Sequence, residues 1–278
     1  MNIKNTIKSA SLLLRQNYIK SNLLDAEIIL SNVMKVKREF LLMNDNLHIS
    51  KKINKEYNNA IKRRSKKEPV AYILGKKEFW SINFHVNKNI LIPRPETELL
   101  VSEVIKFVKN RKIHILDVGT GSGCILLSIL KELHFSKGIG IDISSKAIQI
   151  AKYNARKLNL LNKASFKVSD INNFYIGKYD LIVSNPPYIS TRDLKNLSKE
   201  ITNYEPLKAL NGGIDGLDLT KKVIYKSSWL LKRSGILAIE IGDHQYKKVS
   251  DILKKNGFRE LSKVYDYNFN VRCIISTK

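Results

Sequence analysis

The chain has 278 residues, 43% hydrophobic and 27% charged, which is ordinary for a globular protein with room for one large domain and one small one. No apolar run approaches the roughly 20 residues of a membrane span, and the first residues lack the apolar core of a secretory signal. We therefore expect neither a membrane nor a secreted protein. Cys124 and Cys273 provide no disulfide framework, and we expect free thiols in a cytoplasmic protein.

The net charge of +24 is the unusual bulk property. Such an excess favours nucleic acid, ribosomes or an acidic protein as partners. Lysine, isoleucine and asparagine are all abundant and share AT-rich codons, so compositional bias explains the charge equally well. Charge alone decides nothing.

Residues 1–67 are predicted to form a small helical domain. Apolar residues recur at helical spacing in three stretches, and Asp25 would cap or charge the start of the second helix. The three stretches are Ile7, Ala10, Leu13 and Leu14; Ala26, Ile29, Leu30 and Val33; and Tyr57, Ala60 and Ile61. The third helix has a basic margin that is either a solvated face or a docking surface: Lys51, Lys52, Lys55, Lys62, Arg63, Arg64, Lys66 and Lys67.

Residues 68–91 are predicted to be a linker with a short hairpin. The pair Glu68-Pro69 breaks the preceding helix, and the hairpin is expected around Ser81-Ile82-Asn83. We expect the aromatic side chains of this segment to pack rather than to bind a ligand.

Residues 92–278 are predicted to be an α/β domain. Strands are expected at 113–118, 138–143, 165–168, 179–184 and 236–241. The run 93–98 is expected to enter a helix with an apolar stripe from Leu100 to Val108, and further helices are expected from about Ser122 and at 145–158, 219–231 and 245–255. Strands separated by helices indicate a doubly wound parallel sheet. Two closely spaced strands, at 260–264 and 271–275, predict an antiparallel edge.

A glycine loop follows the first of these strands. The residues are Gly119, Thr120, Gly121, Ser122 and Gly123, in the pattern G-x-G-x-G, which lets a ligand approach the backbone closely. Cys124 stands where a dinucleotide fingerprint has its third glycine, so the pyrophosphate signature is missing. This departure counts against a dehydrogenase.

Acidic residues end the next two strands. Asp142 lies about 20 residues beyond the first strand, where a carboxylate can accept hydrogen bonds from ribose hydroxyls. Asp170 could accept from the exocyclic amine of adenine. Taken singly, Asp142 could equally cap a helix and Asp170 could stabilise a turn, but their joint spacing favours a nucleoside site.

The fourth strand ends in Asn185-Pro186-Pro187-Tyr188. Two prolines remove two backbone donors, so the chain must leave the sheet here, at the edge where open α/β sheets bind ligands. The Asn185 amide, the Pro186 carbonyl and the Tyr188 ring suit a planar group that carries an NH2. Taken alone, the tetrapeptide could also be a turn that merely ends a strand.

This ordered set resembles the class I S-adenosylmethionine-dependent methyltransferases. More closely, it resembles the protein-(glutamine-N5) methyltransferases that modify peptide chain release factors, the PrmC/HemK family. The resemblance covers nearly the whole chain, and besides the glycine loop and Asn185–Ile189 it includes four runs: Ile92–Glu98, Tyr204–Leu210, Gly212–Gly216 and Glu240–Gly242.

The resemblance implies a Rossmann-like methyltransferase sheet with a small N-terminal helical domain that helps to hold the substrate. It implies that Gly119–Gly123, Asp142 and Asp170 bind S-adenosyl-L-methionine, which leaves as S-adenosyl-L-homocysteine. Asn185 would contact both cofactor and substrate, Pro186, Pro187 and Tyr188 would complete the substrate pocket, and Asn185, Pro186 and Tyr188 would serve catalysis. Ile171 stands where family members often place an aromatic residue against the adenine.

The implied activity is methylation of the side-chain N5 of the glutamine in the Gly-Gly-Gln motif of release factors. We expect the Asn185 side-chain oxygen and the Pro186 carbonyl to accept the two N–H groups of this glutamine and so hold its nitrogen toward the methyl donor. The histidines show no metal-ligand spacing, so no metal is expected. The expected enzyme is a cytoplasmic monomer whose partners are release factors, with no membrane partner and no requirement for direct nucleic-acid binding.

Two alternatives stay open on the sequence. One is the same chemistry on a ribosomal-protein glutamine or on adenine-N6, although the 90 residues after Tyr188 (278 minus 188) leave little room for a base-reading domain. The other is a non-enzymatic ribosome- or RNA-binding protein that keeps a methyltransferase fold. The intact glycine loop and tetrapeptide argue against it.

Overall fold

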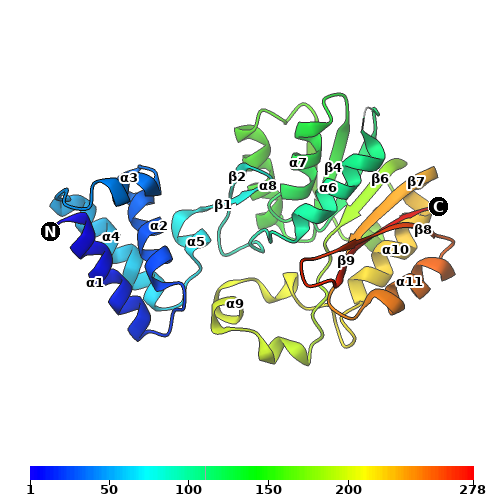
Figure 1. Ribbon diagram of the computed structural model, residues 1–278. Coiled ribbons are helices and arrows are strands. Elements are labelled where there is room, and N and C mark those ends of the chain that lie inside the picture. The colour runs from blue at the N-terminus through cyan, green and yellow to red at the C-terminus, as the bar shows by residue number, and fades with distance from the viewer. Residues whose placement is uncertain (110) are drawn as a thin grey trace. The chain divides into compact units, whose positions relative to one another are not determined.

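A computed structural model describes residues 1–109 and 111–278, which group into two units (Figure 1). The helical unit comprises Met1–Lys76 together with Ser198–Tyr204, and the sheet unit comprises Lys77–Leu197 and Glu205–Lys278. The helical unit therefore includes a short segment from far along the chain. The predicted division into a docking domain, a linker and a methyltransferase domain stays a prediction. Within the described residues, no helix combines the length and apolarity that crossing a bilayer would require.

The helical unit contains α1 (Ile3–Gln16), α2 (Asn22–Met34), α3 (Arg38–Met43), α4 (Lys51–Ser65), α5 (Val70–Leu74) and α9 (Lys199–Tyr204). The Asn2 side chain caps α1 by accepting from the Asn5 N–H at 2.9 Å. Leu14 is fully buried, whereas the neighbouring Leu13 is 41% exposed. The two differ because adjacent residues on a helix point about 100° apart.

Two arginines of the predicted basic margin have opposite environments. Arg63 is half-exposed and pairs with Glu68 at 2.6 Å. Arg64 is buried, and its Nε lies 2.7 Å from a carboxylate oxygen of Asp25, in the first turn of α2. Its Nη1 lies 3.0 Å from a carboxylate oxygen of Glu200 in α9. The interpretation of Arg64 as part of an exposed margin was wrong, and its role is to join three segments of the helical unit.

A hairpin begins the second unit, but its turn lies earlier than predicted. Strands β1 (Lys76–Phe79) and β2 (Ile82–His85) are joined by Trp80 and Ser81, both with positive φ (53° and 54°). Neither residue is a usual choice for such a turn, so its position could not be read from turn chemistry. The buried rings of Phe79 and Phe84 meet edge to face at 6.2 Å. We did not predict α5.

The second unit is built on a seven-stranded sheet of order β5-β4-β3-β6-β7-β9-β8. Its strands are β3 (His114–Val118), β4 (Lys137–Asp142), β5 (Ala164–Val168), β6 (Tyr179–Ser184), β7 (Leu231–Glu240), β8 (Arg259–Tyr265) and β9 (Val271–Thr277). The first five in this order pair in parallel, and β9 pairs antiparallel with β7 and β8. The predicted doubly wound sheet with an antiparallel edge is confirmed.

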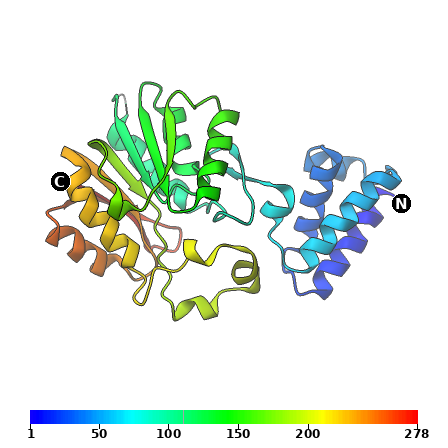
Figure 2. The same ribbon diagram turned by 180° about the vertical axis from the view of Figure 1, so that it is seen from behind.

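Helices cover both faces of this sheet (Figures 1 and 2). Helices α6 (Thr97–Val108), α7 (Cys124–Glu132) and α8 (Ser145–Lys157) bury their apolar sides on one face. Helices α10 (Asp218–Leu230) and α11 (Tyr246–Lys255) cover the other, with the short 3-10 turn η1 (Ile171–Asn173). Two further turns, η2 (Asp193–Asn196) and η3 (Leu207–Ala209), lie between β6 and α10.

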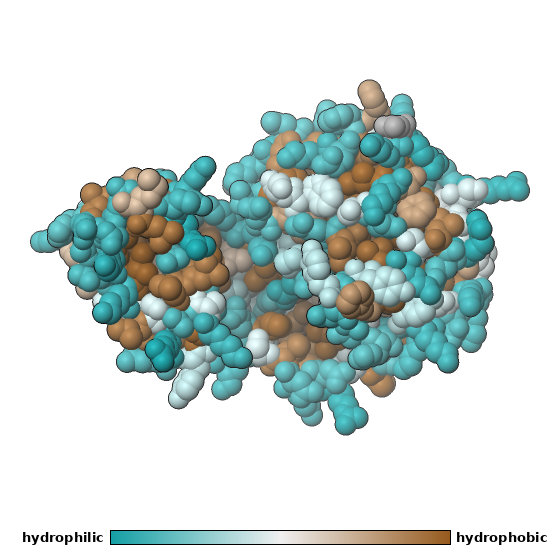
Figure 3. Space-filling view, viewed as in Figure 1, coloured by the Kyte–Doolittle hydropathy of each residue, from teal (hydrophilic) through white to brown (hydrophobic). Residues whose placement is uncertain are grey.

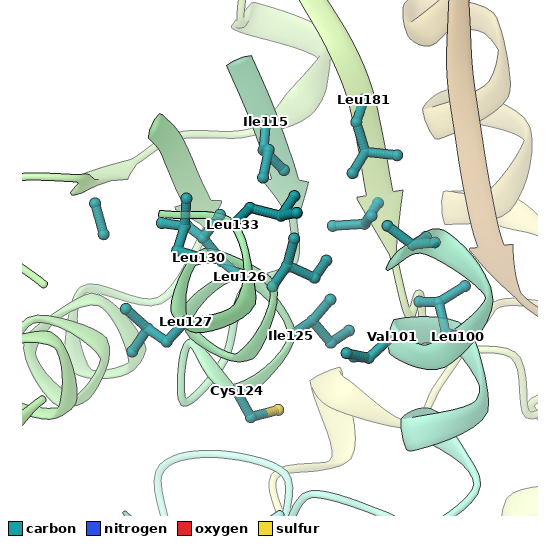
Figure 4. Close-up of a cluster of buried hydrophobic side chains, with 14 of the residues drawn as sticks. Leu100, Val101, Ile115, Cys124, Ile125, Leu126, Leu127, Leu130, Leu133 and Leu181 are labelled. Atoms are coloured by element: carbon teal, nitrogen blue, oxygen red, sulfur yellow. The ribbon is translucent and has the colours of Figure 1, made fainter. Parts of the chain in front are cut away.

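The start of α6 is anchored in this core. Leu100 and Val101 are fully buried in the same hydrophobic cluster as Leu181 of β6 (Figure 4). Deep burial of apolar side chains fixes the backbone that carries them. The packing therefore holds the first residue of α6, Thr97, near the end of β6.

Candidate active site

The predicted site segments meet at one edge of the sheet. Strand register places Val118 opposite both Ile141 and Ser184, and Asp142 opposite Val168. The glycine loop, Asp142, Asp170 and Asn185 thus lie at or just beyond the carboxyl ends of four adjacent parallel strands, where α/β sheets bind ligands.

The glycine loop presents backbone on an open side. Its three glycines have φ of +74°, +54° and +81°, a region that residues with a β-carbon rarely adopt. A β-carbon added at Gly119 would meet nothing within 4 Å. The loop is therefore shaped by its own strand connection and leaves space beside its backbone for a bound group.

Asp142 holds this loop in place. Its carboxylate accepts from the Gly121 N–H at 3.0 Å and from the Ser144 N–H at 2.9 Å. Burial raises the pKa of Asp142, although these backbone donors oppose the shift. Ser144, not Asp142, caps α8. The next residue, Ile143, is 62% exposed, an apolar side chain at the site edge that the sequence reasoning missed.

Asp170 and Ile171 have different environments. Asp170 is exposed and accepts from the Asn172 N–H at 2.8 Å, so it stabilises η1. Ile171 is buried in the cluster that contains Phe174 and Tyr179. Of these two isoleucines, only Ile143 exposes its side chain at this edge of the sheet.

A buried carboxyl group lies beneath the glycine loop. Asp117 is fully buried, and one of its oxygens accepts from the Thr120 hydroxyl at 2.6 Å. The other oxygen has no hydrogen-bond partner among the described residues. Burial raises the pKa of Asp117 to about 7. An unpartnered buried oxygen is costly, so this atom is suited to a donor from a bound group.

The tetrapeptide is held by contacts from distant segments. The Asn185 side-chain nitrogen donates to the Thr97 hydroxyl at 3.1 Å, which leaves its oxygen directed elsewhere. The Tyr188 carbonyl accepts from the Gln245 side chain at 2.9 Å. Burial raises the pKa of Tyr188 to about 12, so its phenol is neutral. Gln245 also donates to the Gly216 carbonyl and accepts from the Gly242 N–H, and its role was missed.

A second buried carboxyl group closes the site. Glu240 ends β7, and it lies beside Asn185 because Ser184 pairs with Ile239 in register. Burial raises the pKa of Glu240 to about 7, while the side chains of Thr97 and Asn185 lie against the carboxyl group and act in the opposite direction.

Two of the sequence runs also contact one another. Glu205 is buried; one oxygen lies 2.6 Å from an Arg94 guanidinium nitrogen, and the other accepts from the Ile92 N–H at 3.2 Å. A β-carbon at Gly212 would lie 2.6 Å from the Pro187 carbonyl oxygen, so only glycine allows this approach. These contacts brace the chain on both sides of the tetrapeptide.

Comparisons with known proteins agree with this architecture. Residues 5–75 match the family model of the PrmC N-terminal domain, and residues 109–270 match that of a methyltransferase domain. A methyltransferase from Pyrococcus furiosus shares the fold with a TM-score of 0.55 at 16% identity, over 80% of this chain and 98% of its own.

Two full-length relatives define the family more narrowly. The release factor glutamine methyltransferase of Clostridium acetobutylicum is 36% identical over 282 residues, covering 100% of this chain and 99% of its own length. That of Buchnera aphidicola subsp. Schizaphis graminum is 40% identical over 278 residues and covers both chains completely. The chain therefore belongs to the release factor glutamine methyltransferase family.

Proposed function

We propose that this enzyme transfers the methyl group of S-adenosyl-L-methionine to the side-chain amide nitrogen of the glutamine in the Gly-Gly-Gln motif of peptide chain release factors. The observation that carries the proposal is the Asn185 amide, which lies at a strand end and donates through its nitrogen to Thr97, so that its oxygen is the atom left to act as acceptor. The relatives' names favour a release-factor glutamine over adenine or a ribosomal-protein glutamine.

The residues beside the glycine loop fit the cofactor. The open side of Gly119 leaves room against the backbone, Asp142 offers a carboxylate at the second strand end, and Asp117 offers an unpartnered buried oxygen. We assign Gly119, Thr120, Gly121, Ser122, Gly123, Asp142, Asp170 and Asn185 to cofactor binding. When bound, S-adenosyl-L-methionine supplies an electrophilic methyl group on its sulfonium, and no metal is invoked.

The chain's own residues would act by holding the substrate amide. An amide nitrogen is a poor nucleophile because its lone pair is delocalised into the carbonyl. The Asn185 side-chain oxygen and the Pro186 carbonyl accept the two N–H groups of the glutamine, which favours positive charge developing on nitrogen. The neutral Tyr188 ring and Pro187 flank the amide plane, and the proton leaves to water.

The helical unit is the proposed docking domain for the release factor. A hollow of about 430 Å³ lies between α1, α2 and α3, and three exposed leucines line it: Leu12, Leu23 and Leu42. Figure 3 shows hydrophobic surface over this unit. Exposed apolar patches of this kind mark protein-interaction sites. A substrate in translation termination places the enzyme in the cytoplasm, and we propose that it acts as a monomer.

The test is methyl transfer from labelled S-adenosyl-L-methionine to a purified release factor, with its Gly-Gly-Gln glutamine intact or changed to alanine. We expect label only on the intact glutamine, and loss of turnover in Asn185→Ala. Label on DNA or a ribosomal protein instead would keep the chemistry and overturn the substrate. Turnover by Asn185→Ala near the wild-type rate would overturn the assignment of Asn185.

A further inference from the structure

We infer that Glu240 is a positioning residue that determines, directly and through Thr97, which way the Asn185 side-chain amide faces. The inference rests on the proposed function, because it concerns the group that receives the substrate amide. Glu240 itself would touch neither substrate nor cofactor.

Three elements bring these side chains together. Asn185 follows β6, Glu240 ends the adjacent strand β7, and Thr97 begins α6. Thr97 and Glu240 are 2% and 1% exposed, so water does not compete for their hydrogen bonds. Asn185 donates to the Thr97 hydroxyl at 3.1 Å, and both side chains lie against the Glu240 carboxyl group.

The chemistry of these groups gives the hydrogen bonds a direction. An asparagine amide has nearly the same shape when its oxygen and nitrogen are exchanged, so only its partners decide its orientation. The Thr97 oxygen accepts from Asn185, and its single hydrogen is left to face an acceptor. In its ionised form Glu240 only accepts, and it then fixes both Thr97 and Asn185 as donors toward it. The Asn185 oxygen then faces the pocket, as acceptance from the substrate NH2 requires.

Stability alone does not account for a carboxyl group in this place. Glu240 is buried at the end of an apolar strand, and its Oε2 has no hydrogen-bond partner among the described residues. The nearby cation, Arg272, forms its ion pairs with Asp243 and Asp266, both at 2.9 Å, and not with Glu240. An apolar or amide side chain would be easier to bury here. The carboxyl group therefore serves the orientation of its neighbours.

The decisive variants keep the shape of a side chain and change which hydrogen bonds it can donate or accept. In Glu240→Gln, the new NH2 can donate to Thr97, whose hydroxyl then donates to Asn185 and favours the reversed amide. We expect kcat to fall about 10- to 100-fold, since misplaced hydrogen-bond partners act on the transition state. The free energy of unfolding should not fall below that of wild type, because an amide is easier to bury than a carboxyl group, and the cofactor Kd should stay close to wild type. In Thr97→Val, which removes the hydroxyl, kcat should fall by a similar factor. The matched control Thr97→Ser keeps the hydroxyl and should keep most of the activity.

A double-mutant cycle then tests whether the residues act as one unit. The combined Glu240→Gln, Thr97→Val variant should be no slower than the worse single variant, because the orienting chain is already broken. Independent, multiplicative losses would overturn the inference, as would full activity in Glu240→Gln or a kcat loss that follows lost stability. If wild-type enzyme labels another acceptor, the proposed substrate fails, and the same cycle on that acceptor still tests Glu240.

Discussion

Replacing Arg64 with methionine should destabilise the helical unit strongly. The Arg64 side chain is 6% exposed and that of Asp25 is 8% exposed, so the substitution leaves a buried carboxylate without its cation. Breaking a buried pair in this way costs about 3–5 kcal/mol, whereas the half-exposed partner Glu200 adds little. For a unit of this size, each kcal/mol lowers Tm by roughly 4–8 °C, so we expect a fall of roughly 12 °C or more.

The neighbouring Arg63 provides the control. Arg63→Met removes a half-exposed ion pair with Glu68 and should cost less than about 1 kcal/mol. Both tryptophans, Trp80 and Trp229, lie in the other unit, so their fluorescence reports on the sheet, while far-ultraviolet circular dichroism also reports on the helices. In urea titrations, Arg64→Met should lower the urea midpoint of the dichroism transition by more than that of the fluorescence transition.

A second substitution measures the cost of leaving the Asp25 carboxylate buried without Arg64. Asp25→Asn in the Arg64→Met background should recover much of the lost stability, because it removes the uncompensated carboxylate. If Arg64→Met and Arg63→Met differ by less than about 1 kcal/mol, the reasoning from burial is refuted.

Three further predictions concern the sheet unit. Burial raises the pKa values of Asp117 and Glu240 to about 7 from ordinary values of 3.8 and 4.5, so the folded chain binds more protons between these limits. Its free energy of unfolding should therefore fall as pH rises from about 4.5 to about 7, and it should fall less steeply in Glu240→Gln. If urea titrations give wild type and Glu240→Gln the same slope of unfolding free energy against pH, this prediction is contradicted. Gly140→Ala should cost about 1–3 kcal/mol in the same assay, since its β-carbon would lie 2.6 Å from a threonine hydroxyl; an unchanged midpoint would refute the clash. Burial raises the pKa of Cys124 to about 12 and that of Cys273 well above its usual value. Mass spectrometry should therefore find neither cysteine alkylated by iodoacetamide before unfolding. Rapid labelling of the native protein would contradict their burial.

Much of the sheet could be predicted because its signals are local. The strand Tyr179–Ser184 was predicted with its observed bounds, since an apolar run ends at two prolines. The strand β7 was predicted to begin at Ile236 but begins at Leu231, because the polar residues in between hide its first part. Lys232 there pairs with Asp180 of β6, a contact that no period in the sequence reveals.

The sequence predicted the site residues at the strand ends, but not the residues that hold them in place. Asn185 was found because it directly follows a strand, and Asp142 because it ends one. Thr97 and Glu240 stood inside runs that carried the family resemblance, yet nothing in the sequence brought them to Asn185. That juxtaposition depends on sheet order and on the packing of α6, which are non-local. Gln245 was missed for the same reason.

The segment 198–204 has a consequence for how this protein can be recombined. The chain passes between its two units three times, at residues 76/77, 197/198 and 204/205. A graft cut only at the first crossing would join Arg64 of one parent to residue 200 of another, and would replace Tyr204, whose hydroxyl donates to the Lys66 carbonyl. The helical unit is thus not a detachable cassette. Its segment 198–204 lies in the chain between two parts of the sheet unit. A viable chimaera must therefore take residues 1–76 and 198–204 from the same parent.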